Sequence, residues 1–241
     1  MWEPRTIVFG VRHKKRFSFL DNAGEVIDSV IEMQEAGELP SGVKFENVGW
    51  QKTLARLQDA KAGVTLDLDV DGIVLTVNAS RSSLRRESTK RLLVTLAPQI
   101  LRITGGDDRV DRIGALEQYT FTHESSGEVA LTALTNLSNL GTGTDITMRV
   151  SFRGPTEDGL VSREIQDWRN TILQVWNRAG DTSEVDLKQL NVSIDFQTYF
   201  VPERQYSSNL IEDHYRRFLE RLEQLQTGRL AGLAGDQQLT R

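Results

Sequence analysis

Cysteine is absent from all 241 residues of the chain. Its absence excludes disulfide frameworks, thiolate zinc sites, iron–sulfur clusters and cysteine nucleophiles. Long apolar runs are also missing, since no stretch reaches the roughly 18 uncharged residues of a membrane-spanning helix. The polar start, Met1 to Arg5, has no apolar segment behind a basic end, so no secretory signal is expected. We therefore expect a cytoplasmic protein.

The composition is typical of a folded globular protein, with 38% hydrophobic residues, 26% charged residues and only 5 prolines. Acidic residues outnumber basic ones by 34 to 29, which gives a net charge of −5. Such a balance argues against a dedicated nucleic-acid coat or a polybasic membrane binder, but it allows a local basic patch.

The clearest local pattern is a β-hairpin between Val64 and Ala79, with Asp71-Gly72 as its two-residue turn. Pairing outward from this turn places three apolar pairs on one face of the ribbon. The pairs are Val70 with Ile73, Leu68 with Leu75, and Leu66 with Val77. The other face is polar apart from Val74, so we predict that one face is buried.

Period-two and period-four patterns give the remaining elements. Strands are predicted over 6–12, 119–122, 128–134, 145–153 and 190–200, and helices over 22–36, 160–177 and 207–226. The segment 90–104 fits either a buried helix or two strands joined at Pro98-Gln99, and its proline and β-branched residues favour the strands. In the predicted helix 160–177, Trp168 and Trp176 share the inner face, so both are expected in the core.

These elements predict an α+β fold in which an extensive antiparallel sheet with hairpins is backed by about three amphipathic helices. One domain over 1–227 is expected, which could also divide into strand–helix halves at about 1–104 and 115–227. The glycine-rich segment 228–241 is expected to be a flexible tail.

Four segments carry a resemblance to a known group. They are Val8-Phe9-Gly10-Val11-Arg12, the strand Ile146 to Arg153, the strand Val192-Ser193-Ile194-Asp195-Phe196, and His214 with Phe218 in the last helix. Their order resembles a sporadically distributed bacterial protein family of unknown function, over nearly the whole chain. The resemblance implies a bacterial accessory gene of the kind carried with mobile or defence loci, and it brings no catalytic residues.

Asp67, Asp69, Asp71 and Gly72 match the first ligand positions of a calcium-binding loop. Position 12 of such a loop would be Asn78 instead of the bidentate glutamate, and the hairpin register explains the same carboxylates as a solvent-facing acidic row. A weak cation site and a purely structural row are both open.

Two basic runs could form a phosphate-binding surface if the fold brings them together. The first contains Arg12, His13, Lys14, Lys15 and Arg16. The second contains Arg81, Arg85, Arg86, Lys90 and Arg91. The alternative is that both are solvated loops, which the net acidic charge and the lack of interleaved aromatic residues favour.

The three histidines, His13, His123 and His214, lie too far apart in the sequence for a metal motif. His214 falls on the apolar face of the last helix, so a buried, hydrogen-bonded role is favoured over a catalytic base. Leu230 and Leu233 are the apolar residues of the tail, and they are candidates for contact with a partner.

No nucleophile, phosphate-loop or cofactor motif is found, so the sequence reveals no reaction and no cofactor is expected. The leading hypothesis is a non-enzymatic subunit that binds another protein in a bacterial cytoplasmic complex. The first alternative is a nucleic-acid-associated subunit that uses the two basic runs. The second is a divalent-cation-dependent hydrolase built around Asp67, Asp69 and His123. The oligomeric state is left open.

Overall fold

The structure is a computed structural model. It describes residues 1–15, 17–40, 43–51, 53–104, 109–123, 126–135, 146–155, 167–177, 188–228 and 230–234. Within these ranges one antiparallel sheet of nine strands has the order β2-β3-β4-β5-β1-β6-β9-β8-β7. The α+β class with an extensive antiparallel sheet is confirmed.

The strands alternate buried and less buried residues, as a sheet with one covered face requires. Their bounds are β1 (Thr6–His13), β2 (Asn47–Gln51), β3 (Leu54–Asp59), β4 (Val64–Asp69), β5 (Gly72–Asn78), β6 (Arg109–Thr122), β7 (Thr147–Pro155), β8 (Trp168–Asn177) and β9 (Gln189–Gln205). The helices are α1 (Ser18–Glu35), α2 (Arg86–Ile103), α3 (Ser126–Thr135) and α5 (Ser208–Thr227), followed by the short 3-10 helix η1 (Ala231–Leu233).

The order of elements repeats along the chain, and the sheet extends outward from the β1–β6 pair with four strands beyond β1 and three beyond β6. β1, α1, the strands β2 to β5 and α2 are followed by β6, α3, the strands β7 to β9 and α5. β1 and β6 pair antiparallel at the centre, with β5 outside β1 and β9 outside β6. Both halves therefore share one continuous sheet.

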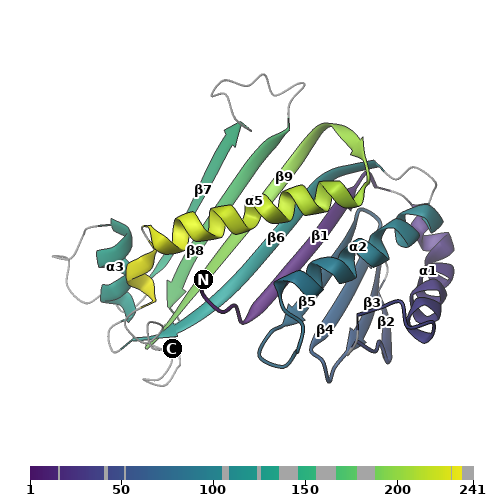
Figure 1. Cartoon of the computed structure of the whole chain (residues 1–241), viewed down its shortest axis with the longest axis horizontal. Coiled ribbons are helices and arrows are strands. Elements are labelled where there is room, and N and C mark those ends of the chain that lie inside the picture. Colours follow the sequence, from purple (N-terminus) through teal and green to yellow (C-terminus); the bar gives the residue numbers. More distant parts are fainter. Residues whose placement is uncertain are drawn as a thin grey trace.

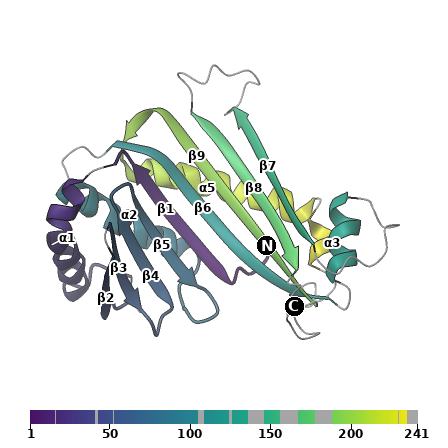
Figure 2. The ribbon, with the colours of Figure 1, turned by 180° about the vertical axis from the view of Figure 1, so that it is seen from behind.

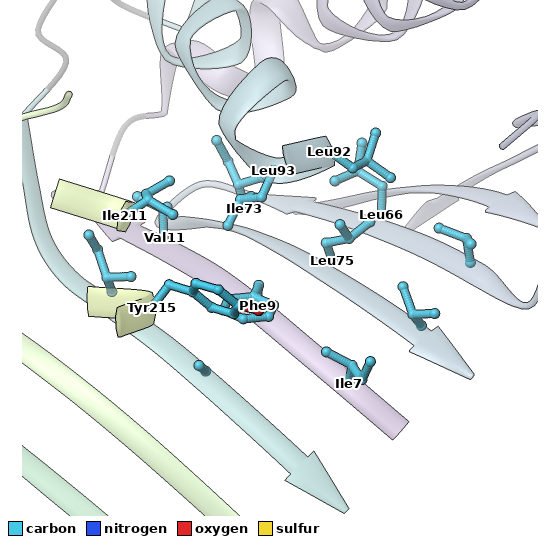
Figure 3. Close-up of a cluster of buried hydrophobic side chains, with 14 of the residues drawn as sticks. Ile7, Phe9, Val11, Leu66, Ile73, Leu75, Leu92, Leu93, Ile211 and Tyr215 are labelled. Carbon is cyan, nitrogen blue, oxygen red and sulfur yellow. The ribbon is translucent and has the colours of Figure 1, made fainter. Parts of the chain in front are cut away.

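Helices α2 and α5 cross one face of this sheet (Figure 1), and α1 packs against α2 beside the β2–β5 half. The core lies between these helices and the covered face of the sheet. There Phe9 meets Tyr215 and Phe218 of α5, and Leu92 and Leu93 of α2 face Leu66, Ile73 and Leu75 (Figure 3). Complete burial of each such side chain contributes about 1.5–3 kcal/mol, which fixes both helices to the sheet.

The predicted hairpin is present as β4 and β5, with a register different from the predicted one. Leu68 pairs with Ile73, Leu66 with Leu75, and Asp69 with Gly72, so Val70 and Asp71 form the turn. The shift is by two residues, which keeps the same side chains on the buried face. Gly72 lies in the strand instead, where a Cβ would lie 3.3 Å from the Val11 carbonyl oxygen of β1 and would make a tight contact.

The two strands predicted within 90–104 are wrong, because this segment belongs to helix α2. Its buried residues Leu92, Leu93, Leu96, Ile100 and Leu101 recur every three or four positions and cover β1 and β5. Pro98 lies inside the helix and removes one helical hydrogen bond. The burial of this apolar stripe outweighs that loss.

In two other segments the secondary structure is the opposite of the predicted one, a helix in place of a strand and a strand in place of a helix. Residues 128–134, predicted as a strand, lie in helix α3, which packs against β8, β9 and η1. The predicted helix 160–177 is wrong over 168–177, which form strand β8, while 160–166 lie outside the described residues. Trp168 and Trp176 are therefore not core residues of a helix.

The remaining helices differ from prediction at their ends. Helix α1 begins at Ser18, four residues before the predicted start, and places Phe19 in the core. It ends before Gly37, whose φ of +73° closes the helix through a bond from the Glu38 N–H to the Met33 carbonyl, 2.9 Å long. Helix α5 agrees with the predicted segment within one residue at each end, and strand β9 contains the predicted segment 190–200 but continues to Gln205.

The tail predicted from residue 228 is folded as far as Ala234. Leu230 and Leu233 are both buried, and η1 contacts α3 and α5. The His123 imidazole Nε2 also lies 2.7 Å from the Leu233 carbonyl oxygen. These leucines belong to the core of this chain, which corrects their assignment to a partner contact. Residues 235–241 lie outside the described part.

Candidate nucleic-acid interface

The second face of the sheet carries no helix among the described residues, and Figure 2 views the molecule from that side. We call it the bare face. Its residues alternate with the core residues along each strand, so their positions follow from the strand registers. Most of them are partly exposed, and they lie in rows that run across the strands.

The most ordered of these rows joins arginine and aromatic side chains across β6, β9 and β8. Arg112 pairs with Tyr199, which pairs with Trp168. The Tyr199 and Trp168 rings are stacked 3.8 Å apart at 2°. The Arg112 guanidinium lies 5.4 Å from the Tyr199 ring, and that of Arg153 on β7 lies 5.9 Å from the Trp168 ring. We call these four residues the arginine–aromatic row.

A chain of hydrogen bonds orients this row along the bare face. Arg112 Nη1 donates to the Tyr199 hydroxyl at 3.2 Å, and that hydroxyl donates to Gln197 Oε1 at 2.5 Å. Gln197 Nε2 then donates to the Asp195 carboxylate at 2.6 Å. Burial raises the pKa of Asp195, although Gln197, Arg112 and Arg149 act in the opposite direction. These hydrogen bonds orient the polar side chains of the row without the help of a ligand.

Two glycines meet at the centre of the bare face, where β1 pairs with β6. Gly10 and Gly114 are directly opposite each other, between the pair Arg12 and Arg112 and the pair Val8 and Leu116. A Cβ on Gly10 would lie 3.2 Å from the Ile73 carbonyl oxygen, so a larger residue here would require β5 to move by a few tenths of an ångström. The missing side chains leave the backbone open to close approach by a ligand.

Positive charge is concentrated on the half of the bare face formed by β6 to β9. Three arginines, Arg112, Arg149 and Arg153, lie there with a single aspartate, Asp195, among the residues that the registers of these strands place on this face. The other half holds Arg12 and Arg56, but both are paired with carboxylates. The half with the stacked aromatic rings is therefore the one that can attract anions.

The predicted basic runs do not come together. Arg12 lies at one end of β1, while the Ala79 N–H binds the Arg5 carbonyl at the other end, just before the second run. Eight residues of strand separate them by roughly 25 Å. Arg86 is bound to Glu117 and Lys90 to Glu87 and Glu212, while Lys14, Lys15, Arg81, Arg85 and Arg91 are exposed. Arg16 lies outside the described residues.

The carboxylates of the acidic hairpin are already engaged within the chain. Arg56 binds both oxygens of Asp67 at 2.6 and 2.9 Å, and Arg12 binds Asp71 at 3.0 Å. Asp69 accepts a bond from the Val70 N–H at 2.6 Å. Across the described residues, no group of three or more histidine, aspartate or glutamate side chains is arranged to hold a metal ion. Asp67 and Asp71 therefore act as ion-pair partners of Arg56 and Arg12 within the sheet.

The three histidines occupy separate places. His214 is buried and bonded to Thr198, as predicted for a histidine on the apolar face of the last helix. His13 is buried at the end of β1, and His123 contacts the tail. His123 is bound near α3 and η1, whereas Asp67 and Asp69 lie on β4, separated from β6 by two strands. The three residues of the predicted hydrolase site are not brought together.

The sequence contains a local signal for strand β8 of the bare face, which the helix prediction over 160–177 missed. In 168–177 the residues Thr171, Leu173 and Val175 alternate with Ile172, Gln174 and Trp176, which is a period-two pattern rich in β-branched residues. Arg112 and Tyr199, in contrast, lie 87 positions apart, and no local pattern joins them.

Comparison with known proteins adds no assignment. Neither a scan against models of protein families nor a search of curated proteins finds a match to this chain. The resemblance to a sporadic bacterial family therefore stays a prediction. Among the described helices, none combines the length and apolarity needed to cross a membrane.

Proposed function

We propose that this protein binds nucleic acid on the bare face of its sheet. The observation that carries the proposal is the arginine–aromatic row, in which Arg112 and Arg153 flank the stacked rings of Tyr199 and Trp168. Guanidinium groups pair with phosphate oxygens, and aromatic side chains on an open sheet provide surfaces for bases.

The rest of the bare face has the chemistry of a sequence-tolerant nucleic-acid surface. Amide and hydroxyl side chains such as Gln118, Asn191 and Ser193 can bond to bases or sugars, and Val8 and Leu116 offer apolar contact. The net charge of −5 does not oppose this proposal, because helix α1 alone carries five acidic residues and no basic one. A local positive field is sufficient for phosphate contact.

Charge reversal in the row is expected to weaken binding strongly. In fluorescence anisotropy with labelled single-stranded and double-stranded oligonucleotides, the double variant Arg112→Glu with Arg153→Glu should bind roughly 100-fold more weakly. Loss of a charge-assisted bond costs about 1.5 kcal/mol per arginine, or about tenfold. The slope of log affinity against log salt should also become shallower by about 1.4–1.8, the share of two phosphate contacts.

A matched control reverses the same charge elsewhere. Lys14→Glu with Arg81→Glu alters one exposed residue in each predicted basic run. Since salt near 0.1 M screens charges beyond roughly 10 Å, we expect this variant to change affinity by less than about threefold. Equal weakening by both double variants, or no binding by the unmodified protein at low salt, would contradict the proposal.

The edge strand β2 favours a second function, in which an extended segment of a protein partner adds as a further strand. Val48 is 52% exposed and Trp50 is 49% exposed on this strand. Unprotected edges with exposed apolar residues are unusual in monomers. This form of binding would make the protein a subunit of a complex.

The test is whether a companion protein remains bound only when the edge strand β2 is unaltered. The tagged protein, purified gently from its host, should retain a stoichiometric companion, and the variant Val48→Lys with Trp50→Lys should lose it because charge opposes strand addition. The Arg112→Glu, Arg153→Glu variant serves as the control and should keep the companion. Retention of the companion by the β2 variant would exclude this edge.

A further inference from the structure

The edge strand β2 carries no charged residue, and among the described strands it pairs with β3 only. Val48 is opposite Leu57 and Trp50 is opposite Ala55, and both of these β3 residues are buried. Val48 and Trp50 therefore lie on the covered face of the sheet, although each is about half exposed. A further strand added beside β2 would place alternate side chains next to both of them.

Helix α1 borders this edge on the covered face of the sheet (Figure 1). The Phe19 ring of α1 stacks on Trp50, with the ring centroids 6.3 Å apart at 14°. The Phe45 N–H, just before β2, donates to Gln34 Oε1 of α1 at 2.6 Å. Ile31 lies three residues before Gln34, so it is on the side of α1 that faces β2. We call this side of α1, together with β2, the β2–α1 corner.

The β2–α1 corner is strongly acidic. Residues 18–51 contain seven acidic residues and a single lysine. Asp28 and Glu35 are exposed on α1, three residues before and four residues after Ile31, so they border the corner. Glu46, directly before β2, lies 3.8 Å from two lysines, so the carboxylates of α1 supply most of the negative charge. A second copy of this chain would bring two acidic helices together, whereas a basic partner is attracted.

We propose that the β2–α1 corner binds an extended segment of a protein partner in which apolar and basic residues alternate. The backbone of this segment continues the sheet beside β2, and its apolar side chains cover Val48 and Trp50. Its lysine or arginine side chains are attracted by the carboxylates of α1. The inference names the partner for the edge-strand function proposed above and rests on that function. It is independent of nucleic-acid binding on the bare face.

Fluorine NMR measures binding at this edge directly, because the chain has only 4 tryptophans. The full chain is labelled with 5-fluorotryptophan, and the variant Trp50→Phe assigns the Trp50 resonance. A short peptide of alternating lysine and valine, added to about 1 mM at low salt, should shift this resonance and leave that of Trp168 in place. This range saturates a site with a dissociation constant of about 0.1 mM. An oligonucleotide should shift the Trp168 resonance instead, which separates this site from the bare face.

Matched peptides separate strand addition from general charge attraction. A peptide with glutamate in place of lysine should bind at least about tenfold more weakly, because its charge is repelled by α1. A peptide with the same lysines but prolines in place of the central valines should not shift the Trp50 resonance, because proline cannot donate a backbone hydrogen bond. An unmoved Trp50 resonance with the lysine–valine peptide, or an equal shift with either control peptide, would overturn the proposal.

Variants of the protein test the charge of α1. The double variant Asp28→Lys with Glu35→Lys should weaken binding of the lysine–valine peptide about tenfold. Glu220→Lys with Glu223→Lys, which reverses two exposed carboxylates on α5, should change it by less than about threefold. Equal affinity in the α1 variant would overturn the proposal. A companion that requires β2 but contacts it through an acidic or uncharged segment would leave the edge-strand function standing and overturn only this inference.

Discussion

Glu117→Gln is expected to lower the free energy of unfolding by about 3–5 kcal/mol. Glu117 on β6 is fully buried and accepts bonds from Arg86 at 2.6 and 2.9 Å and from the Tyr119 hydroxyl. Arg86 also donates to the Trp2 carbonyl at 2.6 Å, which ties α2 and the N-terminal segment to the sheet. Loss of the carboxylate leaves a guanidinium that is only 20% exposed without its counter-charge.

Thermal or urea unfolding measures this effect. For a chain of this length, the expected loss corresponds to a decrease in Tm of roughly 6–20 °C. Glu220→Gln is the matched control, because Glu220 is 55% exposed in its pair with Arg216 and exposed pairs contribute at most about 1 kcal/mol. If Glu117→Gln costs no more than Glu220→Gln, the buried network does not tie α2 and the N-terminal segment to the sheet.

Truncation after Thr227 is expected to destabilise the protein by roughly 3–6 kcal/mol. It removes Leu230 and Leu233, which are 1% and 0% exposed, and complete burial of a leucine contributes about 1.5–3 kcal/mol. It also removes the carbonyl that contacts His123 and the η1 contact with α3. Denaturant midpoints at unchanged slope give the loss.

The chain that ends at Ala234 is the reference for this truncation, because it keeps both leucines. The double variant Leu230→Ala with Leu233→Ala in the full chain should reproduce most of the loss without a change in length. Equal stability of the two truncated chains would show that the segment after Thr227 is dispensable for folding.

The hairpin illustrates how much of a sheet can be predicted from alternation. Leu66, Leu68, Ile73 and Leu75 were assigned to the buried face, and they are buried. Registers that differ by two residues bury the same set, so the pattern alone did not separate them. The pairing of β5 with β1 favours the observed register, because a Cβ at position 72 would lie only 3.3 Å from the Val11 carbonyl oxygen and glycine avoids this tight contact.

The segment with the two tryptophans shows why periodicity failed elsewhere. Trp168, Ile172 and Trp176 are spaced by four, and four is close to one helical turn and is also an even number of strand residues. The same spacing therefore places the three side chains on one face of either element. The choice is made by tertiary pairing, since β8 lies between β7 and β9.

The candidate site could not be predicted from the sequence, for a different reason. It consists of single residues from four strands, and the row exists only because of the order β6-β9-β8-β7. Arg112 follows Arg109 and Asp111 in a short segment of mixed charge that no basic run marks, whereas the conspicuous basic runs fall at opposite ends of β1. Clusters of charge in the sequence were thus a poor guide to clusters of charge on the surface.

The central claim, that nucleic acid lies on the bare face, can be tested by thiol protection, because the chain has no cysteine of its own. Gln118→Cys places one thiol on the bare face in β6, and Gln224→Cys places one on the exposed surface of α5. Maleimide labelling is then timed with and without a saturating oligonucleotide. The account predicts slower labelling of the Gln118→Cys protein only. Protection of the Gln224→Cys thiol, or unchanged labelling of both thiols under binding conditions, would contradict it.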